Sequence, residues 1–143
     1  MIDYKNNLKD SLEQYLNTWP WEWFLAARLK NQYYGLILKQ FRIALQKDEH
    51  LQIAYVGIYV SYPQPHLHML MLGQNKKGKS LSKVDSKCWE REWQNITHNT
   101  AIIENIYDQE RVVSYMVKYN MPTHHHEELV PYNTKLLKRT KIK

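Results

Sequence analysis

Two histidines one residue apart, His66 and His68, stand in the apolar run PQPHLHMLMLG, residues 63–73. Successive side chains of a strand point to opposite faces, so the two imidazoles share one face while Leu67 and Met69 line the other. Two imidazoles side by side on a strand are suited to hold a divalent metal ion. The spacing therefore predicts a pair of metal ligands.

A second set of reactive side chains lies in RVVSYMVKYN, residues 111–120. At helical spacing, the valines and methionine of this segment form one apolar stripe, and Tyr115, Lys118 and Tyr119 cluster on roughly the opposite side. The ordinary role of such tyrosines is packing at the edge of the core with the hydroxyl in water. The alternative is that two phenols and an ammonium group share a reactive helix face.

Taken together, the strand and the helix match one reaction. A tyrosine hydroxyl, with a pKa of about 10, is a weak nucleophile at neutral pH, so attack on a phosphodiester needs a cation beside the reacting oxygens. His66 and His68 could hold that cation, and Lys118, one turn from Tyr115, could help to hold the phosphate or the phenolate. A divalent ion would polarise the phosphate while the phenol displaces an oxygen in line.

The surrounding pattern predicts an α+β domain in the order helix, then β-α-β-β-α-β-α. The expected helices span residues 5–17, 31–50, 81–96 and 109–120. The expected strands span residues 21–29, 51–62, 66–72 and 101–108, and the middle two form an antiparallel hairpin. This order can build an antiparallel sheet of about five strands with helices packed mainly on one face, a ferredoxin-like or split βαβ plan with an added N-terminal helix. One sheet face then remains for function.

A length of 143 residues suits one domain, and 43% apolar residues suffice for a core. We divide the chain into an N-terminal helix (1–18), a catalytic core (19–120) and a basic C-terminal tail (121–143). No apolar stretch has transmembrane length and the N-terminus is too polar for a signal peptide, so we expect a cytoplasmic protein without membrane association. The single Cys88 excludes an internal disulfide and a cysteine-based zinc site.

The net charge of +6 is unevenly distributed. The last thirteen residues carry five basic residues and no acid, and a second basic cluster follows the histidine strand. A polyanionic partner such as nucleic acid fits both clusters, although solvated surface explains lysine-rich stretches equally well. The candidate DNA contacts are Lys76, Lys77, Lys79, Lys138 and Arg139.

Three motifs in order resemble the HUH endonucleases, and among them the rolling-circle replication initiators of small plasmids and viruses. The motifs are WFLAARL, HLHMLM and a YxxK helix, YMVK, within about residues 20–120. The resemblance implies a nick in single-stranded DNA at a replication origin, a 5′-phosphotyrosine link and a free 3′-hydroxyl. It implies Tyr115 as the nucleophile, His66 and His68 as ligands of Mn²⁺ or Mg²⁺, and Lys118 as an accessory cation. Some members use a second tyrosine four residues further on, which here would be Tyr119.

The sequence departs from this family at the third metal ligand. Members often add a carboxylate on the strand before the histidine motif, where this chain has YVSY, residues 59–62. The third ligand is therefore unassigned, with Asn120, Gln109 and Glu110 as candidates and water able to complete the shell. The run His124–His126 is expected at the surface, because adjacent side chains point in different directions.

Two other functions remain open. A single-tyrosine transposase pairs the same kind of histidine strand with a tyrosine helix. A non-catalytic basic module would bind single-stranded nucleic acid and keep the histidines as packing residues. Trp89 and Trp93, four residues apart on an expected helix, would stack on bases or pack in the core, and core packing is the default for such a pair. No Walker glycine loop is present, so a replication initiator of this kind would need a separate helicase and polymerase.

Overall fold

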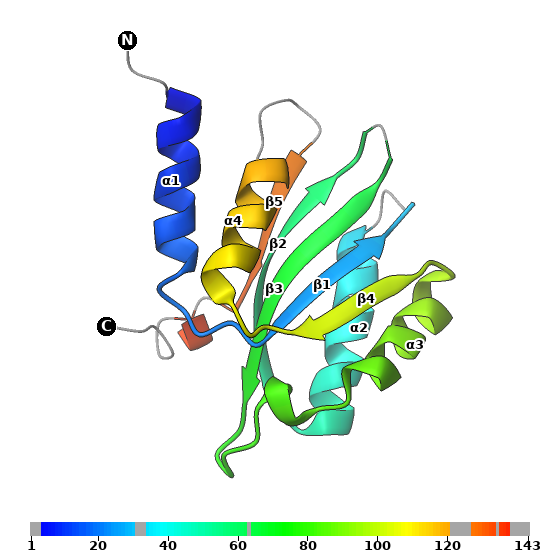
Figure 1. Ribbon diagram of the computed structural model, residues 1–143. Helices are drawn as coiled ribbons and strands as arrows, with labels where there is room; N and C mark the ends of the chain where they lie inside the picture. Colours follow the sequence, from blue (N-terminus) through cyan, green and yellow to red (C-terminus); the bar gives the residue numbers. More distant parts are fainter. Residues whose placement is uncertain (1–3, 31–33, 63, 121–126, 134, 138–143) are drawn as a thin grey trace.

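The computed structural model describes the chain except for residues 1–3, 31–33, 63, 121–126, 134 and 138–143. A five-stranded antiparallel sheet in the order β4-β1-β3-β2-β5 forms its centre (Figure 1). The strands are β1 (Trp23–Arg28), β2 (Gln52–Val60), β3 (His66–Gln74), β4 (Ala101–Asn105) and β5 (Glu127–Tyr132). The helices are α1 (Tyr4–Leu16), α2 (Tyr34–Glu49), the 3-10 turn η1 (Leu81–Lys83), α3 (Ser86–Thr97) and α4 (Gln109–Asn120). The predicted α+β class and antiparallel sheet are confirmed.

Helices α2 and α3 cover one face of the sheet. The ring of Phe41 on α2 meets Trp89 and Trp93 of α3 edge-on, with centroids 5.8 and 5.2 Å apart. Both tryptophans are buried in the same core as Leu67 and Met69 of β3. The tryptophan pair therefore packs in the core and is not available to stack on bases.

The opposite face is covered in part by α1 and α4, which differs from the prediction of helices mainly on one face. Val113, Met116 and Val117 of α4 pack with Leu70 and Leu72 of β3 in a second core. The reason lies in the central strands, since β2 is buried at every position after its first residue. A strand that is apolar on both faces needs cover on both. We name the face toward α1 and α4 the histidine face, because His66 and His68 alternate with Leu67 and Met69 of the first core and so lie on this side of β3.

The central strands set the neighbours of the two histidines. In the register of the ladder, His68 pairs with Ala26 of β1 and Ile58 of β2, and His66 pairs with Arg28 and Val60. The predicted hairpin of β2 and β3 is confirmed. The register of β1 on β3 places Arg28 directly beside His66.

Residues after 120 form more than the basic tail that the sequence predicted. β5 pairs with β2 along its whole length and so forms an edge of the sheet. On α2, the guanidinium of Arg42 lies 3.9 Å from the ring centroid of Tyr132, and the hydroxyl of Tyr34 donates a hydrogen bond to Glu128. The sequence of β5 lacks the apolar alternation of a typical strand. It forms a strand because of these contacts with α2 and because it pairs with the edge of β2.

The helices in the described part of the chain include none with the length and apolarity needed to cross a membrane.

Candidate active site

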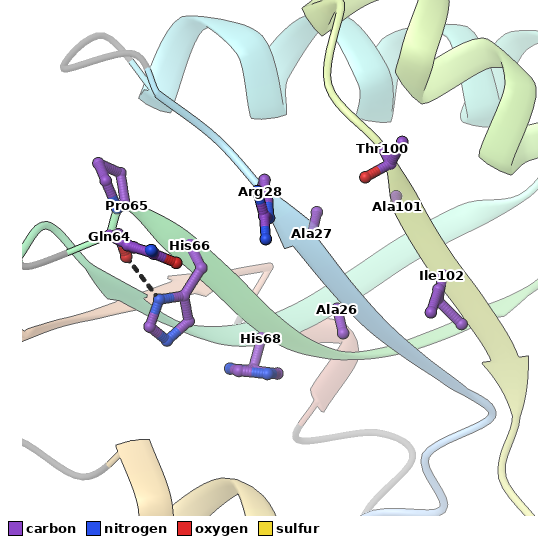
Figure 2. Close-up of a pocket in the computed structure, with 10 residues that line it drawn as sticks. All are labelled: Ala26, Ala27, Arg28, Gln64, Pro65, His66, His68, Thr100, Ala101 and Ile102. Atoms are coloured by element: carbon purple, nitrogen blue, oxygen red, sulfur yellow. Dashed lines mark hydrogen bonds between the residues drawn. The ribbon is translucent and has the colours of Figure 1, made fainter.

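The two histidines lie together, as the strand spacing predicted. Their ring centroids are 5.2 Å apart and the ring planes are 78° apart. Figure 2 shows both rings on the side of the sheet away from α2 and α3, with Ala26 beside them. Both residues are half-buried, so part of each residue is accessible to solvent.

The protonation of the His66 ring is set by the backbone. Its Nδ1 atom lies 2.7 Å from the carbonyl oxygen of Gln64. A carbonyl oxygen only accepts, so Nδ1 carries a proton, and in the neutral ring Nε2 keeps its lone pair. The Nδ1 atom of His68 is shielded from solvent. A backbone carbonyl that orients the ring in this way is the usual support of a metal-binding histidine.

Tyr115 is brought to the same place from α4. Its ring meets His68 edge-on, with centroids 6.1 Å apart and planes at 83°. The side chain is 49% exposed, although its neighbours Met116 and Val117 are fully buried. The apolar stripe of α4 therefore fixes the helix on the sheet and leaves this phenol at the boundary between the histidines and solvent.

Phe24 connects the two parts of the site. Its ring stacks on His68 with centroids 5.6 Å apart and planes at 10°, and it meets Tyr115 edge-on at 6.5 Å. Sequence analysis placed Phe24 in the first motif without a role. The alternation of β1 could have put it on the histidine face, but only the strand order places β1 next to β3.

Lys118 lies one turn beyond Tyr115 and is exposed. Its backbone carbonyl accepts a hydrogen bond from the Lys9 ammonium group of α1, with the two atoms 3.4 Å apart. Tyr119 and Asn120 end α4, and their side chains lie outside the described residues. The choice between one and two tyrosines therefore stays a prediction.

Of the candidates for a third metal ligand, Gln109 has a structural task instead. Its Oε1 accepts the backbone N–H of Trp21 at 2.8 Å and its Nε2 donates to the carbonyl of Trp19 at 2.7 Å, so it fastens α4 to the segment before β1. Glu110 is exposed and lies roughly 140° around the helix from Tyr115.

The donor set fits a weakly held divalent ion. No cluster of three or more His, Cys, Asp or Glu side chains suited to a metal occurs among the described residues. A divalent ion held by two imidazoles would take its remaining ligands from water, and the identity of that ion stays a prediction.

The basic loop after β3 lies away from the histidines. β3 separates the two along its length, from His66 to Gln74, which is roughly 25 Å of strand (Figure 1). In the loop, the ammonium group of Lys79 is 3.2 Å from a carboxylate oxygen of Glu49, while Lys76 and Lys77 are exposed. The loop follows the end of β3 opposite to the histidines, and its contact with DNA stays a prediction.

The remaining predicted contacts, Lys138 and Arg139, and the run His124–His126 lie outside the described residues. Sequence analysis instead missed Arg28. This exposed cation lies beside His66 in the ladder, and nothing in its local sequence distinguishes it.

Comparison with known proteins leaves the family open. No model of a protein family matches the chain, and no curated protein matches it. One solved structure with some likeness is the crystal structure of the hypothetical protein ORF119 from Sulfolobus islandicus rod-shaped virus 1. It shares 18% identity and a TM-score of 0.48, over 80% of this chain and 96% of that chain.

Proposed function

We propose that this chain nicks and joins single-stranded DNA through a covalent phosphotyrosine, and that it does so at a replication origin as an HUH-type initiator. The observation that carries the proposal is the position of the Tyr115 ring beside His68, with His66 on the same open patch of the sheet. A phenol, two imidazoles able to hold a cation and an exposed lysine one turn away can together support phosphodiester transfer to tyrosine.

In the proposed step, the Oη atom of Tyr115 attacks the phosphorus and the bond to the 3′-oxygen breaks. The phenolic proton passes to water, and the departing 3′-oxygen takes a proton from solvent to become a free hydroxyl. The ring of Tyr115 is oriented by Phe24 and His68, and Lys118 supplies positive charge to the phosphate oxygens. Joining is the same displacement in reverse, with the 3′-hydroxyl as the nucleophile.

His66 and His68 would hold Mn²⁺ or Mg²⁺ through their Nε2 atoms. Such an ion, when bound, polarises the phosphate and stabilises the charge that develops on its oxygens. Each side chain would supply one lone pair to that ion, and the Gln64 carbonyl holds the ring of His66 in place. A separate helicase would unwind the duplex, and a separate polymerase would extend the free 3′-hydroxyl.

The proposal is tested by formation of a covalent adduct. The protein is incubated with Mn²⁺ and a labelled pool of random single-stranded oligonucleotides, and a labelled band of higher mass is sought on a denaturing gel. We expect Tyr115→Phe to abolish the band. Tyr107→Phe is the matched control, because Tyr107 is 92% exposed and lies outside the site. An adduct that survives Tyr115→Phe and is lost in Tyr119→Phe would move the nucleophile, and no adduct from either tyrosine would refute the proposal.

Metal binding is tested separately by the electron paramagnetic resonance signal of free Mn²⁺. We expect His66→Gln and His68→Ala each to weaken Mn²⁺ binding by at least tenfold, because loss of one of two protein ligands costs more than 1.4 kcal/mol. His50→Asn is the control, since His50 is exposed, distant in the fold and at a positive φ of 56° that asparagine tolerates. Equal binding in all three variants would contradict the assignment of the histidines.

A transposase would use the same residues, so the substrate must decide between the two roles. Sequencing the DNA attached to Tyr115 and comparing it with the genome separates them. An origin beside a replicon supports initiation, and a transposon end supports transposition.

A further inference from the structure

A pocket of about 350 Å³ opens beside the histidines, where β1 ends and β3 and β4 begin (Figure 2). Apolar side chains, Ala26 and Ile102, form part of its wall, and polar side chains of Arg28, Gln64 and Thr100 form another part. Ile102 is 56% exposed, so its side chain is open to contact with a ligand. A pocket of this size and composition suits a small ring system held by a few polar contacts.

The pocket and the tyrosine lie on opposite sides of the histidines. Tyr115 contacts His68 and Phe24, whereas Arg28 pairs in register with His66. Ala26 pairs with His68, and Arg28 is two residues further along β1. Alternate residues of a strand are roughly 7 Å apart, so Arg28 is displaced along the strand by about that distance from the Ala26–His68 pair. This is close to the separation of neighbouring phosphates in an extended single strand of nucleic acid.

Arg28 gives this end of the histidine face a positive charge. It is exposed, and no ion pair involves it in the part of the chain that the structure describes. The same face also carries an exposed carboxylate, Glu104 on β4, which pairs in register with Phe24. Phe24 is four residues before Arg28 on β1, so Glu104 lies away from Arg28. A planar guanidinium matches a phosphate with two parallel hydrogen bonds.

We propose that this pocket is a subsite for the nucleotide next to the reacting phosphodiester. Arg28 binds the adjoining phosphate, and the base of that nucleotide enters the pocket and packs on Ile102 and Ala26. The identification of the occupant as a DNA nucleotide rests on the proposed function. The subsite would set which nucleotide may flank the nick, which phosphate contacts by themselves do not do.

The test measures binding without chemistry. The protein carries Tyr115→Phe and is titrated in EDTA into two fluorescein-labelled 15-mers, oligothymidylate and a strand of the same length without bases, with fluorescence anisotropy as the readout. We expect Arg28→Gln to weaken binding of both strands about fivefold at low salt and to reduce the slope of log K against log salt by about 0.7. Arg28→Lys should recover part of this loss, because it restores the charge but not the paired hydrogen bonds.

The control for charge is Arg91→Gln, which removes the same charge from an exposed position on α3, on the other face of the sheet. Ile102→Ser tests the base. We expect it to weaken binding of oligothymidylate about threefold and to leave binding of the strand without bases unchanged, because only a base buries apolar surface on Ile102.

Each outcome decides one point. Equal losses from Arg28→Gln and Arg91→Gln would overturn the phosphate contact, and an Ile102→Ser effect that is absent or the same for both strands would overturn the base contact. If the wild-type protein forms the Tyr115 adduct and neither variant changes binding, the subsite is refuted and the nuclease stands. If both variants behave as expected and no adduct forms, the subsite stands as part of a single-strand-binding surface and the nuclease is refuted.

Discussion

The two phenylalanines of the chain offer a matched test of how the site is positioned. Phe24 lies on the histidine face and contacts the rings of His68 and Tyr115. Phe41 lies on the opposite face of the sheet and contacts two tryptophan rings. The same change to leucine at either position removes two aromatic contacts, but only Phe24→Leu removes them from the reactive groups.

The expected stability changes follow from burial. An aromatic pair contributes about 0.5–1.5 kcal/mol beyond the area it buries, and leucine retains most of the apolar surface. Phe24 is half-buried, so Phe24→Leu should lower the free energy of unfolding by about 1 kcal/mol. Phe41 is 1% exposed, so Phe41→Leu also leaves a cavity and should cost about 2–4 kcal/mol. Urea unfolding followed by circular dichroism measures both values.

The expected activities run in the opposite order. Misplacement of a reacting group by about 1 Å can cost 10²-fold in rate. Phe24→Leu should therefore slow formation of the Tyr115 adduct by about tenfold or more per folded molecule, and Phe24→Tyr, which keeps the ring, should restore most of the rate. Phe41→Leu should leave the rate per folded molecule unchanged despite its larger loss of stability. The rates come from gel time courses in which the folded fraction of each variant is known.

The reasoning is refuted if the slower variant is simply the less stable one. Equal slowing by Phe41→Leu and Phe24→Leu at the same folded fraction would show that the rate follows general packing. A Phe24→Leu protein with wild-type rate and wild-type Mn²⁺ affinity would show that neither His68 nor Tyr115 depends on the ring.

Two further predictions concern stability. A Cβ at Gly73 would lie 2.7 Å from Cδ1 of buried Ile53, so Gly73→Ala should lower the free energy of unfolding by about 1–2 kcal/mol. A Cβ at Gly35, in α2, would have nothing within 4 Å, so Gly35→Ala should raise the free energy of unfolding by about 0.5–1 kcal/mol. Urea unfolding of the two variants measures both values. Burial raises the pKa of the Tyr55 phenol, against a smaller lowering by Arg42. Because the unfolded phenol ionises near pH 10 and the folded one at higher pH, this stabilisation is present below about pH 10 and is lost above it. Tyr55→Phe should flatten the alkaline decline measured by unfolding between about pH 8 and 11, and an unchanged decline would contradict the assignment.

The sequence by itself determined the features that depend on local periodicity. Strand alternation places His66 and His68 on one face, and helical spacing places Tyr115 opposite the apolar stripe of α4, whatever else the chain does. The continuous apolar run of β2 also contains the signal that both faces of the sheet are covered, although the one-sided plan did not use it.

The tertiary structure alone decided which of these faces meet. Strand order places β1 beside β3, and so brings Phe24 to His68 and Arg28 to His66, although each pair is separated by about 40 residues of chain. The same order recruits the polar segment Glu127–Tyr132 as an edge strand beside β2. Such pairings come from contacts between distant segments, whose energies depend on the partner that each surface finds and not on the spacing of residues within it.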